Sequence, residues 1–331
     1  MGSLVAHHFL FMTEVVSPLD LDEHSGAALR GNFFDAVWTR FCNNKAALTC
    51  AACPLHTMCP VSALVAPLRE ENERGRDIPR PYVIMPPIGG KKHYEPGAQL
   101  TFGITLFGNI VQLFPYIVMT ANVLESKGLG HRLDENRGQR GRFRIKQIES
   151  CNPISAERQI VYQEGKPKVG VPTISVTSTD IAARAATLSA RKMTVDFLTP
   201  TRIVYKEKLV HHAAFRPLIM RLLERLTALE EAYGGEEGQS PTSRWKELVE
   251  LAEEVQCEDD CTRWEDLRSY SRRLRHTTPI GGIQGRATFV GNLAPFHEVL
   301  AWGELIHVGK NVVKGNGWYR IENESYHYPL R

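Results

Sequence analysis

The chain of 331 residues is too long for one small domain and suits two domains of about 150 residues each. Its hydrophobic share of 43% and charged share of 23% are typical of a folded globular protein and argue against wholesale disorder. No uncharged apolar run of about 18 residues occurs, and the first residues lack the features of a signal peptide, so we expect a cytoplasmic protein that does not bind a membrane. The net charge of +3 neither demands nor excludes nucleic acid, so the distribution of charge is more informative.

In the first half, stretches of strand composition alternate with stretches of helical periodicity. The predicted order is βαββαβ, which is that of a ferredoxin-like α+β unit. The predicted elements are a strand at 6–16, a helix at 26–41, a hairpin formed by 81–87 and 99–108, a helix at 111–126 and a strand at 142–148.

The second half repeats this order, although its sequence is not a copy of the first. We therefore predict two tandem ferredoxin-like domains, at 1–150 and 191–331, joined by a linker at 151–190. The elements expected in the second domain are a strand and turn at 193–205, a helix at 215–232, a charged and partly helical insertion at 234–263, a short strand pair at 281–291, a short helix at 295–302 and a strand ending at 321.

Each half closes with a glycine-rich loop that carries basic residues. Glycine lets backbone amides approach a ligand, and arginine binds phosphate oxygens bidentately, so the pair of loops favours a polyanion; the alternative is two ordinary solvated turns. Trp318 and Tyr319 beside the second loop are candidate stacking platforms for bases. The first loop holds Arg132, Arg137, Arg140, Arg142, Arg144 and Lys146 among Gly128, Gly130, Gly138 and Gly141; the second holds Lys310 and Lys314 among Gly309, Gly315 and Gly317; a third basic run is Arg268, Arg272, Arg273, Arg275 and His276.

Four of the seven cysteines, Cys42, Cys50, Cys53 and Cys59, form a C-x7-C-x2-C-x5-C insertion at about 42–60. Four thiolates in a short segment fit a structural zinc ion, which would leave no open position for a substrate. An iron–sulfur cluster and an absence of metal remain alternatives, and His56 is a substitute ligand. Cys257 and Cys261 are four residues apart and could share a helical face, without an expected function.

Several segments, taken in order, resemble the CRISPR-associated endoribonucleases of the RAMP superfamily, which process precursor CRISPR RNA. The segments are SGAALRGNFFDAV, CPLHTMCP, GLG followed by GRFRI, FLTPTRI, WEDLRSYSRR followed by PIGGIQG, and GELIHVGKNVVKGNGWYRI. The resemblance covers most of the chain. It implies tandem ferredoxin-like domains that bind a CRISPR repeat RNA and cleave it without a metal ion to a 2′,3′-cyclic phosphate and a 5′-hydroxyl. In the last segment, Asn311 stands where similar sequences often have glycine, and Lys314 precedes Gly315, so the backbone path is expected to differ.

Such cleavage needs a general base, a general acid and positive charge near the phosphate. The resemblance places the acid/base histidine at or just before the first helix, which here is His24; the alternative is a polar residue near the helix N-cap. His211 and His212, before the first helix of the second domain, are the reserve candidates, while His307 is expected on a partly buried strand. The residues predicted to bind RNA are Arg30, Arg137, Arg140, Arg142, Arg268, Arg272, Arg273, Gly309, Lys310, Lys314, Gly315 and Gly317.

Two other functions remain open at this point. One is a non-catalytic RNA-binding subunit of a CRISPR effector complex with the same fold, whose partners would include other subunits of that complex. The other is a zinc-dependent enzyme acting at the cysteine insertion.

Overall fold

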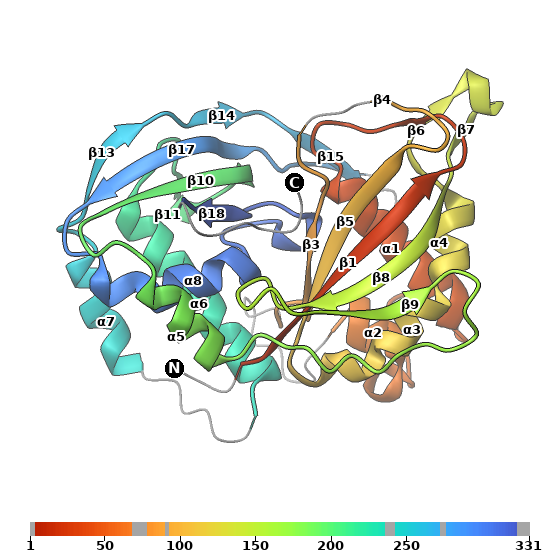
Figure 1. The fold of residues 1–331 in the computed structure, drawn as a ribbon, viewed down its shortest axis with the longest axis horizontal. Coiled ribbons are helices and arrows are strands. Elements are labelled where there is room, and N and C mark those ends of the chain that lie inside the picture. Colours follow the sequence, from red (N-terminus) through yellow and green to blue (C-terminus); the bar gives the residue numbers. More distant parts are fainter. Residues whose placement is uncertain (1–3, 68–77, 90–92, 236–241, 272–275, 323–331) are drawn as a thin grey trace. The chain divides into compact units, whose positions relative to one another are not determined.

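The computed structural model describes residues 4–67, 78–89, 93–235, 242–271 and 276–322, and the chain divides into two compact units (Figure 1). The N-terminal unit comprises residues 5–175, and the C-terminal unit begins at Val176 and includes Leu4. Within the described ranges, none of the helices has the length and apolar character needed to span a bilayer.

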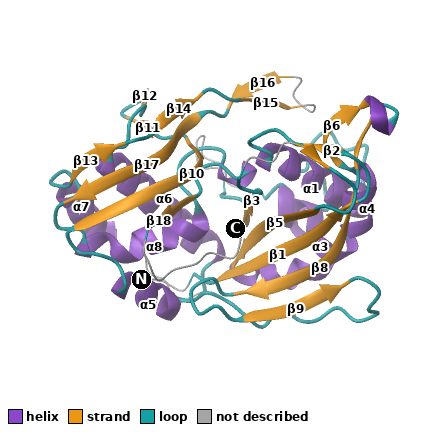
Figure 2. Cartoon of the chain, turned by 45° about the horizontal axis from the view of Figure 1, so that its top comes forward, coloured by secondary structure: helices purple, strands orange, loops and turns teal. Residues whose placement is uncertain are grey.

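The N-terminal unit is a five-stranded antiparallel sheet with the order β3-β5-β1-β8-β9, and its helices lie together on one side of the sheet (Figure 2). The first four strands in this order have the topology of a βαββαβ unit, and β9 extends one edge. The strands are β1 (Ala6–Val15), β3 (Tyr82–Met85), β5 (Gln99–Phe107), β8 (Phe143–Cys151) and β9 (Arg158–Gln163); the helices are α1 (Gly26–Phe41), α2 (Pro60–Val65), α3 (Phe114–Met119) and α4 (Ala121–Lys127).

Aromatic residues fill the core between this sheet and its helices. Phe9 on β1 stacks on Phe114 of α3 with ring centroids 4.5 Å apart, and Phe33 of α1 meets Tyr82 of β3 edge-on at 5.3 Å. Leu29, Phe33 and Val37 recur at helical spacing and are buried, so they form the apolar face that holds α1 on the sheet. The position of α1 is thus fixed by the core.

Two short two-stranded sheets complete this unit. One pairs β2 (Leu19–Asp20) with β4 (His93–Tyr94), and the other pairs β6 (Leu129–Leu133) with β7 (Gln139–Gly141). The β6–β7 hairpin contains the first basic glycine loop.

The C-terminal unit repeats the plan with the order β13-β17-β10-β18, while β14 also pairs with β17. Its helices lie on one side of the sheet (Figures 1 and 2). The strands are β10 (Lys192–Thr201), β13 (Gln256–Asp260), β14 (Arg263–Glu265), β17 (Gly282–Val290) and β18 (Tyr319–Ile321); the helices are α5 (Ser178–Ala186), α6 (Phe215–Tyr233), α7 (Thr242–Leu251) and α8 (His297–Ile306); two hairpins join β11 (Val204–Tyr205) to β12 (Lys208–Leu209) and β15 (Arg268–Ser271) to β16 (His276–Pro279). The prediction of tandem ferredoxin-like folds is confirmed.

The strand pair expected at 281–291 is instead a single strand, β17, and this prediction was wrong. Its hairpin partner is formed by β13 and β14, which lie largely within the acidic segment expected to be a partly helical insertion. All five residues of β13 are exposed, so it has no alternation of apolar and polar residues that would reveal a strand. Cys257 lies on β13 and Cys261 directly follows it, which excludes the shared helical face.

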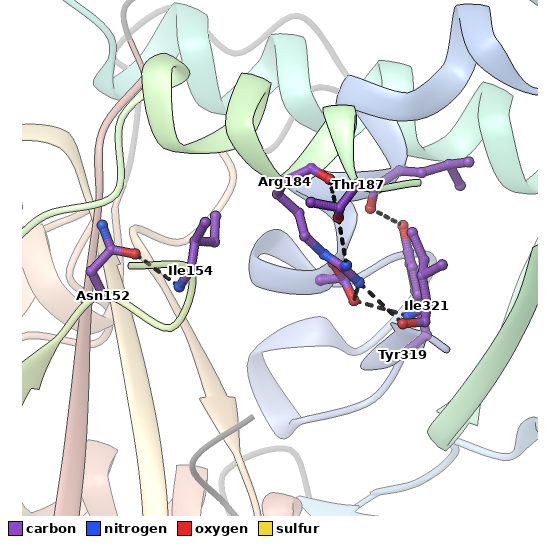
Figure 3. Close-up of polar contacts among 8 residues, drawn as sticks. Asn152, Ile154, Arg184, Thr187, Tyr319 and Ile321 are labelled. Carbon is purple, nitrogen blue, oxygen red and sulfur yellow. Dashed lines mark hydrogen bonds and ion pairs between the residues drawn. The ribbon is translucent and has the colours of Figure 1, made fainter. Parts of the chain in front are cut away.

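The segment 151–190, expected to be a linker, contains β9 and α5. Asn152 shapes the turn after β8, because its Oδ1 accepts a hydrogen bond from the Ile154 amide at 2.9 Å (Figure 3). Helix α5 begins with a capping box formed by Thr177 and Asp180. The boundary between the units lies within this segment, between Ser175 and Val176.

Candidate nucleic-acid interface

His24 lies in the turn that leads directly into α1, as its position in the sequence predicts. Ser25, the N-cap residue, is buried, and the imidazole of His24 is half-buried with its Nε2 atom inaccessible to solvent. The core contacts of α1 therefore hold His24 in a defined place. Its catalytic role stays a prediction.

The β6–β7 hairpin packs against the segment that leads to His24. A Cβ atom on Gly130 would lie 1.8 Å from the Asp20 carbonyl oxygen, and one on Gly141 would lie 2.5 Å from the Cα atom of Leu19. Asn136 donates a hydrogen bond to the Pro18 carbonyl at 2.7 Å. Glycine at positions 130 and 141 thus allows the hairpin to pack closely on β2. The sequence analysis had instead expected these glycines to let backbone amides approach a ligand.

A histidine that sequence analysis did not single out joins this hairpin to the same segment. His131 on β6 lies with its Nε2 atom 2.8 Å from Oδ1 of Asp22, which is two residues before His24. Asn32 on α1 also donates to the Gly128 carbonyl at 3.0 Å, at the base of the hairpin. The basic hairpin and the turn that holds His24 are therefore parts of one local structure.

The basic side chains of the hairpin differ in how far their charge is neutralised. Arg137, in a left-handed conformation with φ 55°, and Arg142 are exposed, and no described acidic side chain lies within ion-pair distance of either. Arg144 has its Nε atom 3.4 Å from Glu164, which also pairs with Lys146. Arg140 is half-buried. Arg132 is also exposed, and its Nη1 atom donates to the Gly138 carbonyl at 3.0 Å, with no described acidic side chain within ion-pair distance. The uncompensated positive charge is therefore carried by Arg132, Arg137 and Arg142.

His93 on β4 lies between two carboxylates, with its Nδ1 atom 2.5 Å from Asp20 and its Nε2 atom 3.1 Å from Glu95. The hydrogen bond to Asp20 is the main cause that raises the pKa of His93, and Glu95 adds to it. Sequence analysis missed His93, because only the pairing of β4 with β2 brings it to Asp20.

Arg30 on α1, predicted to bind RNA, faces the packed side of the helix. Its guanidinium lies 5.1 Å from the ring centroid of Phe34. Burial raises the pKa of Tyr82, and the nearby Arg30 opposes that rise. Arg30 thus interacts with the half-buried Phe34 and with the buried Tyr82 of the N-terminal unit.

The closing glycine loop of the C-terminal unit is shaped by backbone packing. Gly309 and Gly317 have φ values of 84° and 72°, and Cβ atoms there would lie 2.4 Å from the Arg202 carbonyl oxygen and 1.8 Å from the Val308 carbonyl oxygen. Gly315 has φ 82°, and Asn311 has φ 64°. Because asparagine tolerates this region, Asn311 adopts a left-handed conformation that glycine also favours. Lys310 is exposed and Lys314 half-buried.

Trp318 and Tyr319 are not stacking platforms for bases, because both are buried in the C-terminal unit. The Tyr319 hydroxyl donates to the Leu300 carbonyl at 2.8 Å, and the Trp318 ring stacks with the buried His307 at 5.9 Å. His307 is the C-cap residue of α8 rather than a strand residue. Tyr319 and Ile321 are the buried residues of β18, and Trp318 is buried directly before this strand, which its place beside a glycine-rich loop did not indicate in the sequence.

The remaining residues predicted to bind RNA or to serve as reserve catalytic candidates belong to other segments of the sequence than the two glycine-rich loops. Arg268 is exposed on β15, whereas Arg272 and Arg273 fall outside the described residues. His211 and His212 are exposed before α6; His211 packs on Trp264, and His212 lies 3.9 Å from Asp260.

The cysteine insertion connects two helices that pack on each other. Cys42 is the C-cap of α1 and Cys59 the N-cap of α2, while Cys50 and Cys53 lie in the loop between them; all four are half-buried. Among the described residues, no three side chains of metal-ligating type are gathered into a binding group. The four thiols suit zinc by their chemistry, but this arrangement does not converge on an ion. Zinc stays a prediction.

Two family models match the chain in consecutive segments. Residues 4–174 match an N-terminal domain (AF_1859_N), and residues 195–319 match the CRISPR-associated endoribonuclease Cas6. No curated protein sequence matches the chain.

Solved structures share the fold at low sequence identity. A product complex of Cas6 (TTHB231) has a TM-score of 0.56 at 15% identity, over 96% of this chain and 99% of that chain. Thermus thermophilus Cas6 (TTHB231) gives 0.53 at 15% identity, over 97% and 100%. A partial Cas6-RT-Cas1–Cas2 complex gives 0.61 at 12% identity, over 99% of this chain and 48% of that chain. One family model covers the N-terminal unit, and the model of the CRISPR-associated endoribonuclease Cas6 covers most of the C-terminal unit, so the resemblance to CRISPR-associated RAMP proteins predicted from the sequence is confirmed.

Proposed function

We propose that this chain binds CRISPR repeat RNA and cleaves precursor CRISPR RNA without a metal ion. The observation that carries the proposal is local to the N-terminal unit: a histidine in the turn before α1 adjoins a basic hairpin whose exposed Arg132, Arg137 and Arg142 have no described acidic partner. The match of residues 195–319 to the Cas6 endoribonuclease model supports RNA as the substrate. Because a similar chain occurs in a Cas6-RT-Cas1–Cas2 complex, other CRISPR proteins are further proposed partners.

The proposed reaction is an internal transfer within the RNA. The 2′-oxygen loses its proton to a general base and bonds to the adjacent phosphorus, while the bond from phosphorus to the 5′-oxygen breaks and that oxygen takes a proton from a general acid. The products are a 2′,3′-cyclic phosphate and a 5′-hydroxyl. His24 is assigned to one of the two proton transfers, since an imidazole titrates near neutral pH.

Arg137 and Arg142 are assigned to the RNA backbone. Their guanidinium groups present paired donors that match phosphate oxygens and stabilise the negative charge that grows on the phosphate during attack. The anchoring of the hairpin on β2 keeps these charges close to the turn that holds His24.

Cleavage in excess EDTA tests this proposal. Purified protein incubated with a panel of repeat RNAs is expected to give one cut per repeat, with cyclic-phosphate ends that resist a phosphatase until acid treatment opens them. A 2′-deoxy substitution at the cut position should abolish the product. Loss of cleavage in EDTA, with recovery on adding a divalent cation, would contradict the metal-independent mechanism.

A second candidate is a non-catalytic RNA-binding subunit, and one observation favours it. Nε2 of His24 is inaccessible to solvent, so this nitrogen cannot reach a 2′-hydroxyl unless the side chain rotates. Salt-sensitive binding of repeat RNA without cleavage across the panel would support this candidate over the nuclease.

A further inference from the structure

An aromatic and cationic cluster in the C-terminal unit surrounds Trp264, a half-buried residue of β14. The exposed His211, two residues after β12, has its ring centroid 4.2 Å from that of Trp264 at an interplanar angle of 36°. The guanidinium carbon of Arg202 lies 5.6 Å from the Trp264 ring centroid. Figure 2 shows β11, β12 and β14 close together in this unit.

Arg202, which lies beside the Trp264 ring, is held directly opposite a second cation, Lys310. Arg202 and Lys310 form an antiparallel β-bridge, with the Lys310 amide donating to the Arg202 carbonyl at 2.9 Å. Residues directly opposite in such a bridge place their side chains on the same face, where like charges repel. Among the described residues, no carboxylate lies within ion-pair distance of either cation. An anionic ligand would relieve this repulsion.

The backbone of the closing loop makes this pairing possible. A side chain at Gly309 would collide with the Arg202 carbonyl, so glycine there allows the two segments to approach. Nη1 of Arg202 donates to the Gly281 carbonyl at 3.1 Å, which fixes the guanidinium while its other N–H groups stay available to a ligand.

We propose that this cluster binds one unpaired nucleotide of RNA. The base stacks on the exposed face of His211, which Trp264 supports from the other side, and the phosphate pairs with Arg202 and Lys310. Aromatic platforms beside a positive groove are the usual means of binding single-stranded RNA without strong sequence preference. This inference rests on the proposed function for the choice of RNA as ligand.

Binding of a fluorescein-labelled oligouridylate of about 12 nucleotides tests the site apart from cleavage. Stacking of one base on an aromatic side chain contributes 1–3 kcal/mol, so His211→Ala should weaken binding by roughly 5- to 100-fold. His211→Tyr, which keeps a flat ring, should restore most of the affinity. Lys310→Ala should lower the slope of log affinity against log salt by about 1.

Matched controls come from the same unit. His297→Ala removes a histidine at the start of α8, and Lys192→Ala removes a lysine at the opposite end of β10 from Arg202. Both should bind like the wild type, and thermal melts should show that all variants fold. Binding by folded His211→Ala and Lys310→Ala that is equal to the wild type overturns the site.

The two proposals fail in different ways. If the protein cleaves repeat RNA and the His211 and Lys310 variants bind the oligouridylate normally, only this inference is wrong. If repeat RNA stays intact but the His211→Ala defect and its rescue by tyrosine are seen, the nucleotide site stands and the nuclease proposal falls.

Discussion

Arg184 on α5 and Glu304 on α8 form an ion pair in the core of the C-terminal unit, with side chains 2% and 4% exposed. Arg184 Nε lies 2.9 Å from Glu304, and Nη2 donates to the Ile321 carbonyl at 3.0 Å. Figure 3 shows Arg184 reaching from α5 to Ile321 beside Tyr319. Glu304 in turn accepts the Ile321 amide at 2.9 Å, so this pair ties two helices to β18.

Breaking this pair should destabilise the protein strongly. Arg184→Ala leaves a buried carboxylate without its counter-charge, and we expect the free energy of unfolding to fall by about 3–5 kcal/mol. Urea denaturation measures the change, with the exposed Arg191→Ala as a control near the wild-type value. A loss below about 1 kcal/mol, the range of surface ion pairs, would contradict the structural role assigned to Arg184.

His93 provides a pH test of the β2–β4 sheet. Because Asp20 and then Glu95 raise its pKa above the ordinary value of 6.5, its charged form is favoured in the folded state. Its contribution to stability is full below the unfolded pKa and is lost as pH rises through the higher folded pKa. An NMR titration should place His93 above 6.5, and Asp20→Asn should lower that value. An unchanged midpoint in the variant would refute the Asp20 contact.

At the scale of elements, the packing of the β6–β7 hairpin on β2 requires glycine at position 130 but much less at position 138. Gly130 has φ 78° and a Cβ there would meet the Asp20 backbone, whereas Gly138 has φ 73° with nothing within 4 Å of its Cβ position. Gly130→Ala must therefore move the hairpin away from β2, while Gly138→Ala meets only the cost of its conformation.

Cleavage by these two variants tests the anchoring of the hairpin. Gly130→Ala should lose at least about tenfold in cleavage rate, since small displacements of positioning groups are costly. Gly138→Ala should stay within about threefold of the wild type. Equal rates for both variants would show that the place of the hairpin does not matter to the reaction.

The cysteine insertion between α1 and α2 is predicted to bind zinc, and metal analysis tests this prediction. Protein purified without chelators should contain about one zinc ion per chain, and Cys50→Ser or Cys53→Ser should lose it. Cys257→Ser, on the exposed β13, is the control and should keep the metal. Iron with sulfide in place of zinc would indicate a cluster, and a metal-free wild type would contradict both assignments.

For the whole molecule, the duplicated fold could be predicted because its central strands and long helices carry clear periodicity. Helix α1 and strands β1, β5 and β17 contain apolar residues that only burial in a sheet-and-helix core explains. Strand β13 could not be predicted in this way, since its exposed acidic residues owe their conformation to pairing with β17.

The candidate site was only partly predictable, for a similar reason. Its basic residues and His24 are visible in the sequence, because charge and order along the chain are local properties. The pairing of His131 with Asp22, the burial of Trp318 and the contact of His211 with Trp264 depend on tertiary packing. The glycines of the two loops can be counted in the sequence, but only the tertiary structure shows which backbone atoms they approach.

The single-turnover cleavage rate of His24→Ala tests the central claim most directly. With enzyme in excess over repeat RNA, and RNA binding measured in parallel, the variant should bind like the wild type but cut about 10²–10⁴-fold more slowly. His297→Ala, a surface histidine of the C-terminal unit, is the matched control. A His24→Ala protein that cuts repeat RNA at the wild-type rate would contradict the assignment of the reaction to the turn before α1.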